Sequence, residues 1–149
     1  MDNFLTLEKQ LCFAIYETSS EFTKLYSSVL HPFGLTYPQY LVLLALWEKD
    51  GITLKELGNK LNLGTGTLTP MINRMITNEW IRKERSQQDE RKVYIYLEPK
   101  AIHKQEVITD KVKEEIISCH IDVHEYEQLM LQLHQLHQKI KSRKKEKEH

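Results

Sequence analysis

The sequence has 149 residues, of which 40% are hydrophobic and 28% charged, and 21 basic side chains balance 21 acidic ones. This length suits one domain, or one domain with helical extensions, and the composition allows a buried core. No apolar run approaches the roughly 20 residues that a membrane span requires. No basic segment leads into an apolar stretch, as it would in a secretory signal. We therefore expect a cytoplasmic protein with no membrane partner.

A formal net charge of zero argues against a simple polyanion-binding protein, but the charges are unevenly distributed. Acidic side chains dominate from Glu106 to Glu127, and the tail after Lys139 is basic again. Basic side chains gather in the central stretch, at Lys55, Lys60, Arg74, Arg82, Lys83, Arg85, Arg91 and Lys92. This central cluster is the part of the chain where a nucleic-acid surface is expected.

Two helices are predicted before the central stretch. Apolar residues recur at helical spacing from Leu5 to about Leu30, and the segment His31–Gly34 ends that helix because proline and glycine interrupt it. Thr36 is a suitable N-cap for a second helix, Pro38–Glu48, which is apolar nearly all round. This second helix is expected to be the buried hub of the domain.

The central stretch runs from Ile52 to Leu97. Ile52 is expected to add a short strand, and two short helices follow it. The first helix is capped by a box of Thr53 and Glu56. The second helix begins near Thr65, after a break at Asn62–Gly64. Asn78 is expected to end the second helix in a left-handed conformation. A hairpin follows, with strands on either side of a polar tip at Ser86–Glu90. A helix-turn-helix followed by such a hairpin is a winged helix, which points to duplex DNA.

The ends of the chain predict a dimer. Pro99 opens a long helix, a polar break follows near His120–Val123, and the last helix carries an apolar stripe. The first and last helices are too long and too apolar on one face for a small winged domain alone. Packed across a two-fold axis, they would form a homodimer that matches a pseudo-palindromic operator. The expected fold is mainly α (α+β), with residues 36–98 as the winged helix-turn-helix DNA-binding domain and residues 1–35 and 99–149 as the dimerisation region.

Candidate DNA-contacting residues lie on the second helix of the motif and on the hairpin tip. Leu68, Ile72 and Met75 are expected to face the core. The other faces of the helix carry small hydroxyl side chains, a glycine and an arginine, which can approach base edges and phosphates. On the loop, an arginine can enter a minor groove while an aspartate holds its guanidinium in place. The alternative is a capped surface helix followed by a solvated turn. The candidates are Thr65, Gly66, Thr67, Thr69, Pro70, Arg74, Arg85, Asp89 and Arg91.

Other side chains that could carry chemistry are less clearly grouped. His120 with His124, and His134 with His137, have spacings that could bind zinc, but no dense Cys/His cluster surrounds them, so no metal or cofactor is expected. Cys12 is 107 positions from Cys119, and the simplest interpretation of both is as small hydrophobic residues.

Several segments resemble the MarR family of winged-helix regulators, and in particular its peroxide-sensing branch, which includes the organic hydroperoxide resistance regulators and virulence and biofilm regulators of Gram-positive cocci. The resemblance extends from Leu7 to about Leu97. It rests on QLCFAIY, LTYPQYLVLLALWE, LKELGNKLNLGTGTLTPMINRM and RSQQDERKVYIYL. The cysteine of QLCF followed by TYPQY is more specific than the D-x-R motif of the wing.

The resemblance implies roles for particular residues. Cys12 matches the reactive cysteine near the start of the first helix, Tyr26 and Tyr37 match tyrosines that bind its sulfur from the partner subunit, and Tyr16 lies one turn from it. Cys119 lies where some members carry a second cysteine that forms an intersubunit disulfide. A helix N-terminus favours the thiolate form of a cysteine, and tyrosine hydroxyls can donate to it.

The chain departs from the branch at three places. Gly64-Thr65 replaces the usual Asp-Ser, Glu98 replaces a threonine, and Glu79 replaces a glycine, which is why Asn78 is expected to turn the chain.

The sequence thus predicts a redox-sensing transcriptional regulator, a repressor rather than an enzyme. Oxidation of Cys12 would form a sulfenic acid and then a disulfide with Cys119, which alters operator binding. Two alternatives are a regulator that responds to a small phenolic ligand, with Cys12 a bystander, and a thiol peroxidase. The second leaves the wing and the recognition helix without a purpose.

Overall fold

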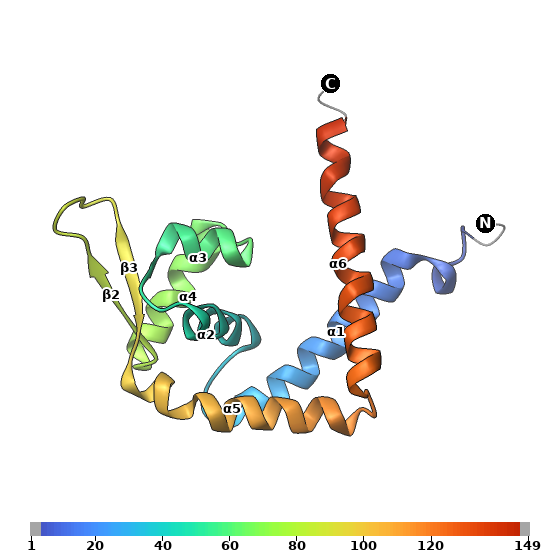
Figure 1. Ribbon diagram of the computed structural model, residues 1–149, viewed down its shortest axis with the longest axis horizontal. Helices are drawn as coiled ribbons and strands as arrows, with labels where there is room; N and C mark the ends of the chain where they lie inside the picture. Colours follow the sequence, from blue (N-terminus) through green and yellow to red (C-terminus); the bar gives the residue numbers. More distant parts are fainter. Residues whose placement is uncertain (1–3, 147–149) are drawn as a thin grey trace. The chain divides into compact units, whose positions relative to one another are not determined.

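The structure, a computed structural model, describes residues 4–146 and is mainly helical with one small sheet (Figure 1). It divides into two compact units, Met1–Val112 and Lys113–His149. The elements in order are η1 (Leu7–Lys9), α1 (Leu11–Leu30), η2 (His31–Phe33), α2 (Tyr37–Glu48), β1 (Ile52–Thr53), α3 (Leu54–Leu61), α4 (Thr65–Thr77), β2 (Ile81–Arg85), β3 (Val93–Leu97), α5 (Pro99–Ser118) and α6 (Val123–Glu146).

The first unit holds the winged helix-turn-helix, so the predicted fold class is confirmed. The start of its first helix differs from the prediction. A 3-10 turn at Leu7–Lys9 is followed by Gln10 in an extended conformation (φ −83°, ψ 126°), and α1 begins only at Leu11. A helix from Leu5 is therefore wrong, and Cys12 is the second residue of α1.

The buried hub of the first unit is α2, as the sequence predicts. Thr36 and Gln39 form a reciprocal capping box, in which the Gln39 amide donates to Thr36 Oγ1 (3.4 Å) and the Thr36 amide donates to Gln39 Oε1 (3.0 Å). Trp47 Nε1 donates to the carbonyl of Ala101 (3.1 Å), which ties the end of α2 to α5. Burial on most sides explains why α2 is apolar nearly all round: the buried residues are Gln39, Tyr40, Val42, Leu43, Ala45 and Leu46.

The sheet has the strand order β1-β3-β2, with both pairings antiparallel. Ile52 of β1 pairs with Ile95 of β3, which confirms the expected short strand. Asp50 connects the turn before β1 to the end of β3, because its Oδ1 accepts hydrogen bonds from the backbone amides of both Gly51 and Leu97 at 2.9 Å.

The turn between α3 and α4 lies where the Asn62–Gly64 break is predicted. Thr53 Oγ1 accepts from the Glu56 amide (3.1 Å), and Asn62 ends α3 in a left-handed conformation (φ 55°). Gly58 is buried, and a Cβ placed on it would lie 2.9 Å from the Leu63 carbonyl oxygen. Glycine at this position therefore lets the turn close directly onto α3.

The end of α4 corrects a second prediction. Asn78 has φ −86° and ψ 8°, whereas Glu79 takes the left-handed conformation (φ 64°). The Trp80 amide donates to the Met75 carbonyl and the Glu79 amide to the Ile76 carbonyl, both at 3.0 Å, which is a Schellman motif with Glu79 in the position that glycine usually takes. Met75 and Trp80 are both buried, so their packing accounts for the strained backbone between them.

Glu79→Gly is expected to stabilise the protein by about 0.5–1 kcal/mol. It removes the left-handed strain of an L-residue, about 1–2 kcal/mol, at an entropic cost of about 0.5–1 kcal/mol. Urea unfolding at fixed protein concentration measures this change. Asn78→Gly is the matched control, and no gain is expected there because φ at this residue is already negative. An unchanged or lower midpoint for Glu79→Gly would contradict the explanation.

The second unit contains the end of α5 and α6, separated by the break predicted at His120–Val123. His120 is left-handed (φ 59°), and Asp122 caps α6 by accepting from the Glu125 amide (2.8 Å). Apolar side chains remain exposed along α6 in a single chain, namely Tyr126, Leu129, Met130, Leu131, Leu133 and Ile140.

In the first unit, α1 likewise exposes Leu11, Ile15 and Phe22. Among the described residues, no single helix is long and apolar enough to cross a membrane. One bent pair of segments, Leu11–Phe33 with Tyr37–Glu48, has the length and the apolar composition that a membrane span needs.

Candidate nucleic-acid interface and sulfur site

The helix α4 presents one buried and one exposed face. Leu68, Met71, Ile72 and Met75 are buried, as the helical spacing predicts. Thr69 is half-buried and faces the wing rather than open solvent. The remaining candidates on this helix are exposed: Thr65, Gly66, Thr67, Pro70 and Arg74.

The wing loop between β2 and β3 is shaped by its own side chains. The Arg91 amide donates to Asp89 Oδ1 (3.1 Å), and Arg91 Nε lies 3.9 Å from the same oxygen. Ser86 Oγ accepts from the Asp89 amide (3.2 Å), and Arg85 Nη1 donates to the Glu90 carbonyl (2.8 Å). Asp89 and Arg85 thus order the loop, while the Arg91 side chain is 96% exposed and directed to solvent.

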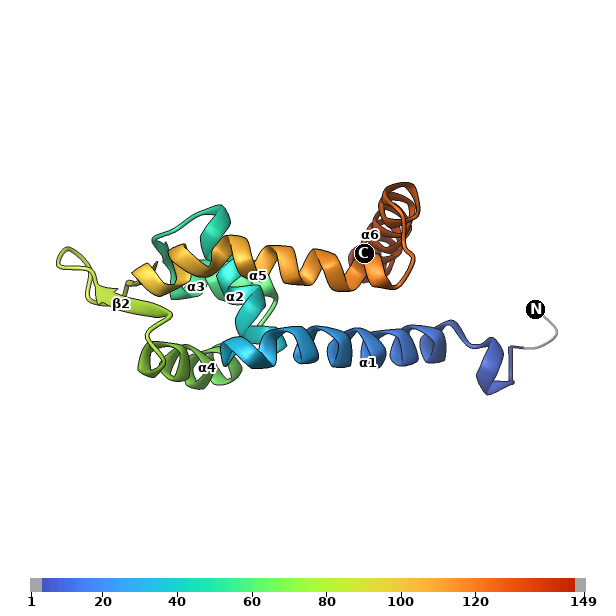
Figure 2. The ribbon, with the colours of Figure 1, turned by 90° about the horizontal axis from the view of Figure 1, so that it is seen from below.

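A groove of about 810 Å³ joins the wing to the helix-turn-helix. It brings Thr65 of α4 together with Asp89 and Arg91 of the loop, and Figure 2 shows the hairpin extending beyond α4. Lys55, Asn59 and Lys92 also line it, although they are not among the predicted site residues. Their signal was available, because Lys55 and Asn59 are four apart on one face of α3.

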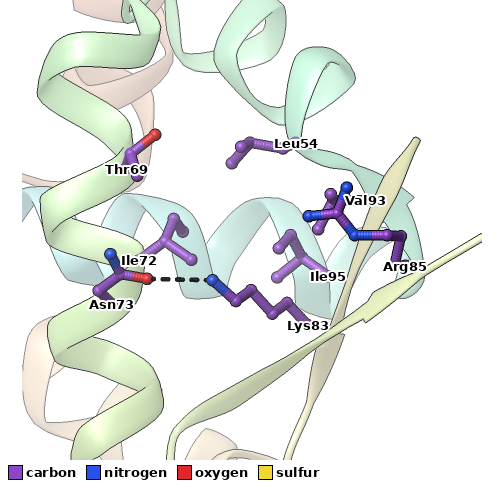
Figure 3. Close-up of a pocket in the computed structure, with 8 residues that line it drawn as sticks. All are labelled: Leu54, Thr69, Ile72, Asn73, Lys83, Arg85, Val93 and Ile95. Carbon is purple, nitrogen blue, oxygen red and sulfur yellow. Dashed lines mark hydrogen bonds between the residues drawn. The ribbon is translucent and has the colours of Figure 1, made fainter. Parts of the chain in front are cut away.

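A smaller cavity of about 250 Å³ separates α4 from the wing strands (Figure 3). Lys83 Nζ donates to Asn73 Oδ1 (3.4 Å) across it. Neither residue is among the predicted DNA contacts, although Lys83 belongs to the predicted basic cluster and Asn73 lies one turn beyond Thr69. The lining residues are Leu54, Thr69, Ile72, Asn73, Lys83, Arg85, Val93 and Ile95.

Arg82 belongs to the basic cluster of the sequence but is engaged within the wing. Its Nη1 donates to the Leu97 carbonyl (3.1 Å) and lies 3.5 Å from a carboxylate oxygen of Glu98. Its Nε donates to the carboxylate of Glu84 (3.3 Å). The guanidinium also lies 4.9 Å from the centre of the Tyr96 ring. The hydrogen bond to Glu84 is the main cause that raises the pKa of Arg82. Arg82 therefore stabilises the outer face of the sheet.

The sulfur of Cys12 is exposed at the start of α1. The first helical bond here runs from the Ala14 amide to the Gln10 carbonyl (3.1 Å), so the earlier amides of the helix are not used by it. The first turn of α1 contains no acidic residue, and the Cys12 thiol lies 3.8 Å from Gln10 Oε1. The structure thus places the sulfur at the N-terminal end of a helix, open to solvent.

Of the tyrosines assigned to the sulfur pocket, Tyr16 lies one turn from Cys12 on α1, whereas Tyr26 and Tyr37 are distant from Cys12 within one chain. Tyr16 is exposed and stacks on Phe13 (6.4 Å between ring centres), whereas Tyr26 packs on Tyr37 (5.1 Å). At 1.5 Å per helical residue, Tyr26 lies roughly 21 Å along α1 from Cys12. A contact between that sulfur and either Tyr26 or Tyr37 would therefore require a second chain.

In the second unit, Cys119 is a free, exposed thiol just beyond the end of α5, and its sulfur lies 3.5 Å from the Glu115 carbonyl oxygen. Within the part of the chain that the structure describes, no group of three or more His, Cys, Asp or Glu side chains is placed to hold a metal ion.

The fold and the exposed helix beside an ordered wing are those of a winged-helix transcriptional regulator of the MarR type. Residues 24–112 match the family described as "Transcriptional regulator SarA/Rot", and the chain belongs to this family. The family assignment agrees with the prediction of a regulator rather than an enzyme.

Two curated relatives show where the chain lies within this group. It is 50% identical over 93 residues to the organic hydroperoxide resistance transcriptional regulator of Bacillus subtilis, covering 62% of this chain and 63% of that protein. It is 40% identical over 96 residues to the regulator MgrA of Staphylococcus aureus, covering 64% of this chain and 65% of that protein. The chain thus spans less than two thirds of the length of these relatives.

Solved structures extend the similarity over most of the chain. Reduced AbfR bound to DNA has a TM-score of 0.81 at 37% identity, covering 91% of this chain and 92% of that one. The repressor CouR, bound to a 23-mer DNA duplex, has a TM-score of 0.81 at 18% identity, covering 89% and 96%, and supports the fold alone.

Arg91→Ala is expected to weaken binding to duplex DNA by about 1–3 kcal/mol per site and to reduce its salt dependence, because one cation per subunit would leave the groove. Fluorescence anisotropy at several salt concentrations measures both effects. The fold should be unchanged, since Arg91 is 96% exposed. Lys24→Ala, which removes the same charge from α1, should leave the affinity unchanged. Equal affinities for Arg91→Ala and the wild type at moderate salt would contradict the role of the wing.

Proposed function

We propose that this protein is a redox-responsive transcriptional repressor that acts in the cytoplasm as a homodimer on a pseudo-palindromic duplex DNA site. The observation that carries the DNA-binding part is the groove that brings Thr65, Asp89 and Arg91 together. In the major groove of DNA, α4 would present its exposed residues Thr65, Gly66, Thr67, Pro70 and Arg74 to bases and phosphates, while Arg91 on the wing would reach the adjacent minor groove.

The proposed dimer uses the apolar faces that a single chain leaves exposed. On α1 these are Leu11, Ile15 and Phe22, and α6 exposes a similar row. Burying such rows against a second copy is favoured at about 25 cal/mol per Å² of apolar surface. A two-fold axis would also place two copies of α4 one helical turn of DNA apart, about 34 Å. Residues 1–35 and 99–149 would form this interface and residues 36–98 the DNA-binding domain; residues 1–3 and 147–149 lie outside the described part.

Cys12 is the proposed sensor. Its thiolate would attack the O–O bond of a hydroperoxide, forming an S–O bond and releasing an alcohol, which leaves a sulfenic acid. A thiol, which we assign to Cys119 of the partner subunit, would then attack that sulfur and release water to form a disulfide. Support comes from the exposed Cys12 at the N-terminus of α1 and from the 50% identity to the organic hydroperoxide resistance regulator. AbfR, 38% identical, has also been solved in a disulfide-formed state.

A hydroperoxide titration of the DNA complex tests this function. Oxidation should weaken the wild-type complex at least 100-fold, which is about 2.7 kcal/mol, while Cys12→Ser should bind DNA normally and resist the oxidant. Tyr26→Phe and Tyr37→Phe should slow the response, because each removes a hydroxyl expected to donate to the sulfur from the partner subunit.

The second candidate, release by a small phenolic ligand, predicts the opposite pattern. Salicylate would weaken the complex of wild type and Cys12→Ser alike, while hydroperoxide would leave both intact. That result would overturn redox control and keep the DNA-binding function.

The role of Cys119 makes a separate prediction. Hydroperoxide should produce a covalent dimer on non-reducing gels, and both Cys12→Ser and Cys119→Ser should abolish it. A disulfide needs α-carbons within about 7 Å, and the end of α5 followed by left-handed His120 offers a place to adjust. A chain that stays monomeric on the gel, with only Cys12 oxidised, would show that Cys119 is a bystander.

A further inference from the structure

One polar pair in the first unit joins the recognition helix to the wing and has no role in the function proposed so far. Asn73 lies on the exposed part of α4, three residues beyond Pro70 and one turn beyond Thr69. Lys83 comes from β2, and its Nζ lies 3.4 Å from Asn73 Oδ1 (Figure 3).

The strand places Lys83 toward α4. In the antiparallel pairing, Lys83 lies opposite Ile95. Both residues line the cavity between the sheet and α4, and Ile72 of α4 lines the same cavity. A lysine stem can lie along such an apolar floor while its ammonium group reaches a polar partner at the rim. The side chain therefore crosses from the sheet to the helix instead of extending into solvent as the side chain of Arg91 does.

The chemistry of this contact fixes the orientation of the carboxamide. A lysine ammonium group has three donors and no acceptor, so the atom of Asn73 that faces it is the oxygen. The NH₂ group of Asn73 consequently points away from Lys83, at the other end of the planar carboxamide. The oxygen has two lone pairs, and Lys83 occupies one of them, which leaves the second able to accept another hydrogen bond.

We propose that Asn73 reads an adenine in the major groove and that Lys83 is its positioning residue. This inference rests on the proposed function, because it assigns a base to the DNA-binding surface. The carboxamide NH₂ donates to adenine N7, and the oxygen accepts from adenine N6 while Lys83 holds its other lone pair. Asn73 is the single carboxamide side chain of α4 (Thr65–Thr77), and the threonine hydroxyls, which both donate and accept, do not impose this choice of base.

Fixing the side chain before binding strengthens this selectivity. A surface asparagine that rotates freely loses conformational freedom when it binds a base, and it can present either its oxygen or its NH₂ group. Lys83 removes both disadvantages, because it holds one rotamer and one amide orientation. The expected consequence is that loss of Lys83 changes base preference, not only overall affinity.

The experiment selects bound duplexes from a randomised pool with the full-length, reduced protein and measures the relative affinity of each single-base variant of the enriched site. Asn73→Ala should lower the preference for adenine at one position of each half-site by roughly 5- to 150-fold and leave the other positions unchanged. Lys83→Met should relax the same position, Lys83→Arg should preserve it, and Lys83→Met should add little to Asn73→Ala.

Gln105→Ala is a matched control. Gln105 is an exposed carboxamide on α5 whose backbone carbonyl accepts from the Thr109 hydroxyl (2.7 Å), as that of Asn73 accepts from Thr77 (3.0 Å). This variant should leave all base preferences unchanged. Urea unfolding of each variant checks that the fold is kept.

Three outcomes would count against these assignments, and they are distinguishable. Unchanged preferences in Asn73→Ala would exclude Asn73 as a base-reading residue. A uniform loss of affinity in Lys83→Met, with a salt slope smaller by about one per subunit, would make Lys83 a phosphate contact and overturn its positioning role. If the wild type enriches no sequence at all, the proposed function itself fails.

Discussion

The connection between α4 and β2 constrains the whole DNA-facing surface. Only three residues separate the recognition helix from the wing, and the last of them, Trp80, is buried beside Met75. Glu79 must therefore reverse the chain in a left-handed conformation. Because this turn is short and anchored on the core, the helix and the strand have little freedom to move relative to each other. That fixed relation is what brings Lys83 within hydrogen-bonding distance of Asn73.

The winged core could be predicted because its patterns are local. Alternating apolar residues identify β3, Thr36 and Thr53 mark helix starts, and Pro70 limits where α4 can begin. Each of these signals acts within a few residues, so the sequence alone suffices to place the helix-turn-helix and the wing along the chain.

Three features could not be predicted from the sequence. One is an interruption of a helix that the apolar pattern conceals, and the other two depend on contacts between residues of different elements. Leu7 and Leu11 continue one apolar stripe, which conceals the interruption of the helix at Gln10. Asparagine adopts the left-handed conformation more readily than glutamate, yet Glu79 takes it, in the turn that lets both Met75 and Trp80 be buried. The bond between Asn73 and Lys83 joins two elements, and no periodicity in either one reveals it.

The basic cluster illustrates how a charge count differs from a binding surface. Arg82 is engaged by Glu84 and Glu98, and Lys60 lies 3.4 Å from Glu48. These cations balance acids of the same unit and stabilise the wing or the helices. Arg91, in contrast, has only a long ion pair, 3.9 Å from its Nε to Asp89, and its side chain remains 96% exposed. A protein with zero net charge can therefore present a positive surface to DNA, because neutralisation occurs elsewhere.

The proposed redox control would place a further demand on the fold, because a change at α1 would have to reach α4 through packed side chains. Tyr26 of α1 contacts Tyr37 and Tyr40 of α2, with ring centres 5.1 and 5.8 Å apart, and Tyr40 in turn packs on Trp47 at 6.3 Å. Large rings in contact do not compress, so a displaced α1 would shift α2 as a body. Oxidised protein would have to favour the displaced state by about 5.5 kcal/mol to convert a population of 1:99 to 99:1. Because Cys12 is exposed, an oxygen added to its sulfur would make few contacts in its own chain. The differential contacts would therefore come from the partner subunit, which makes the dimer a requirement of the switch.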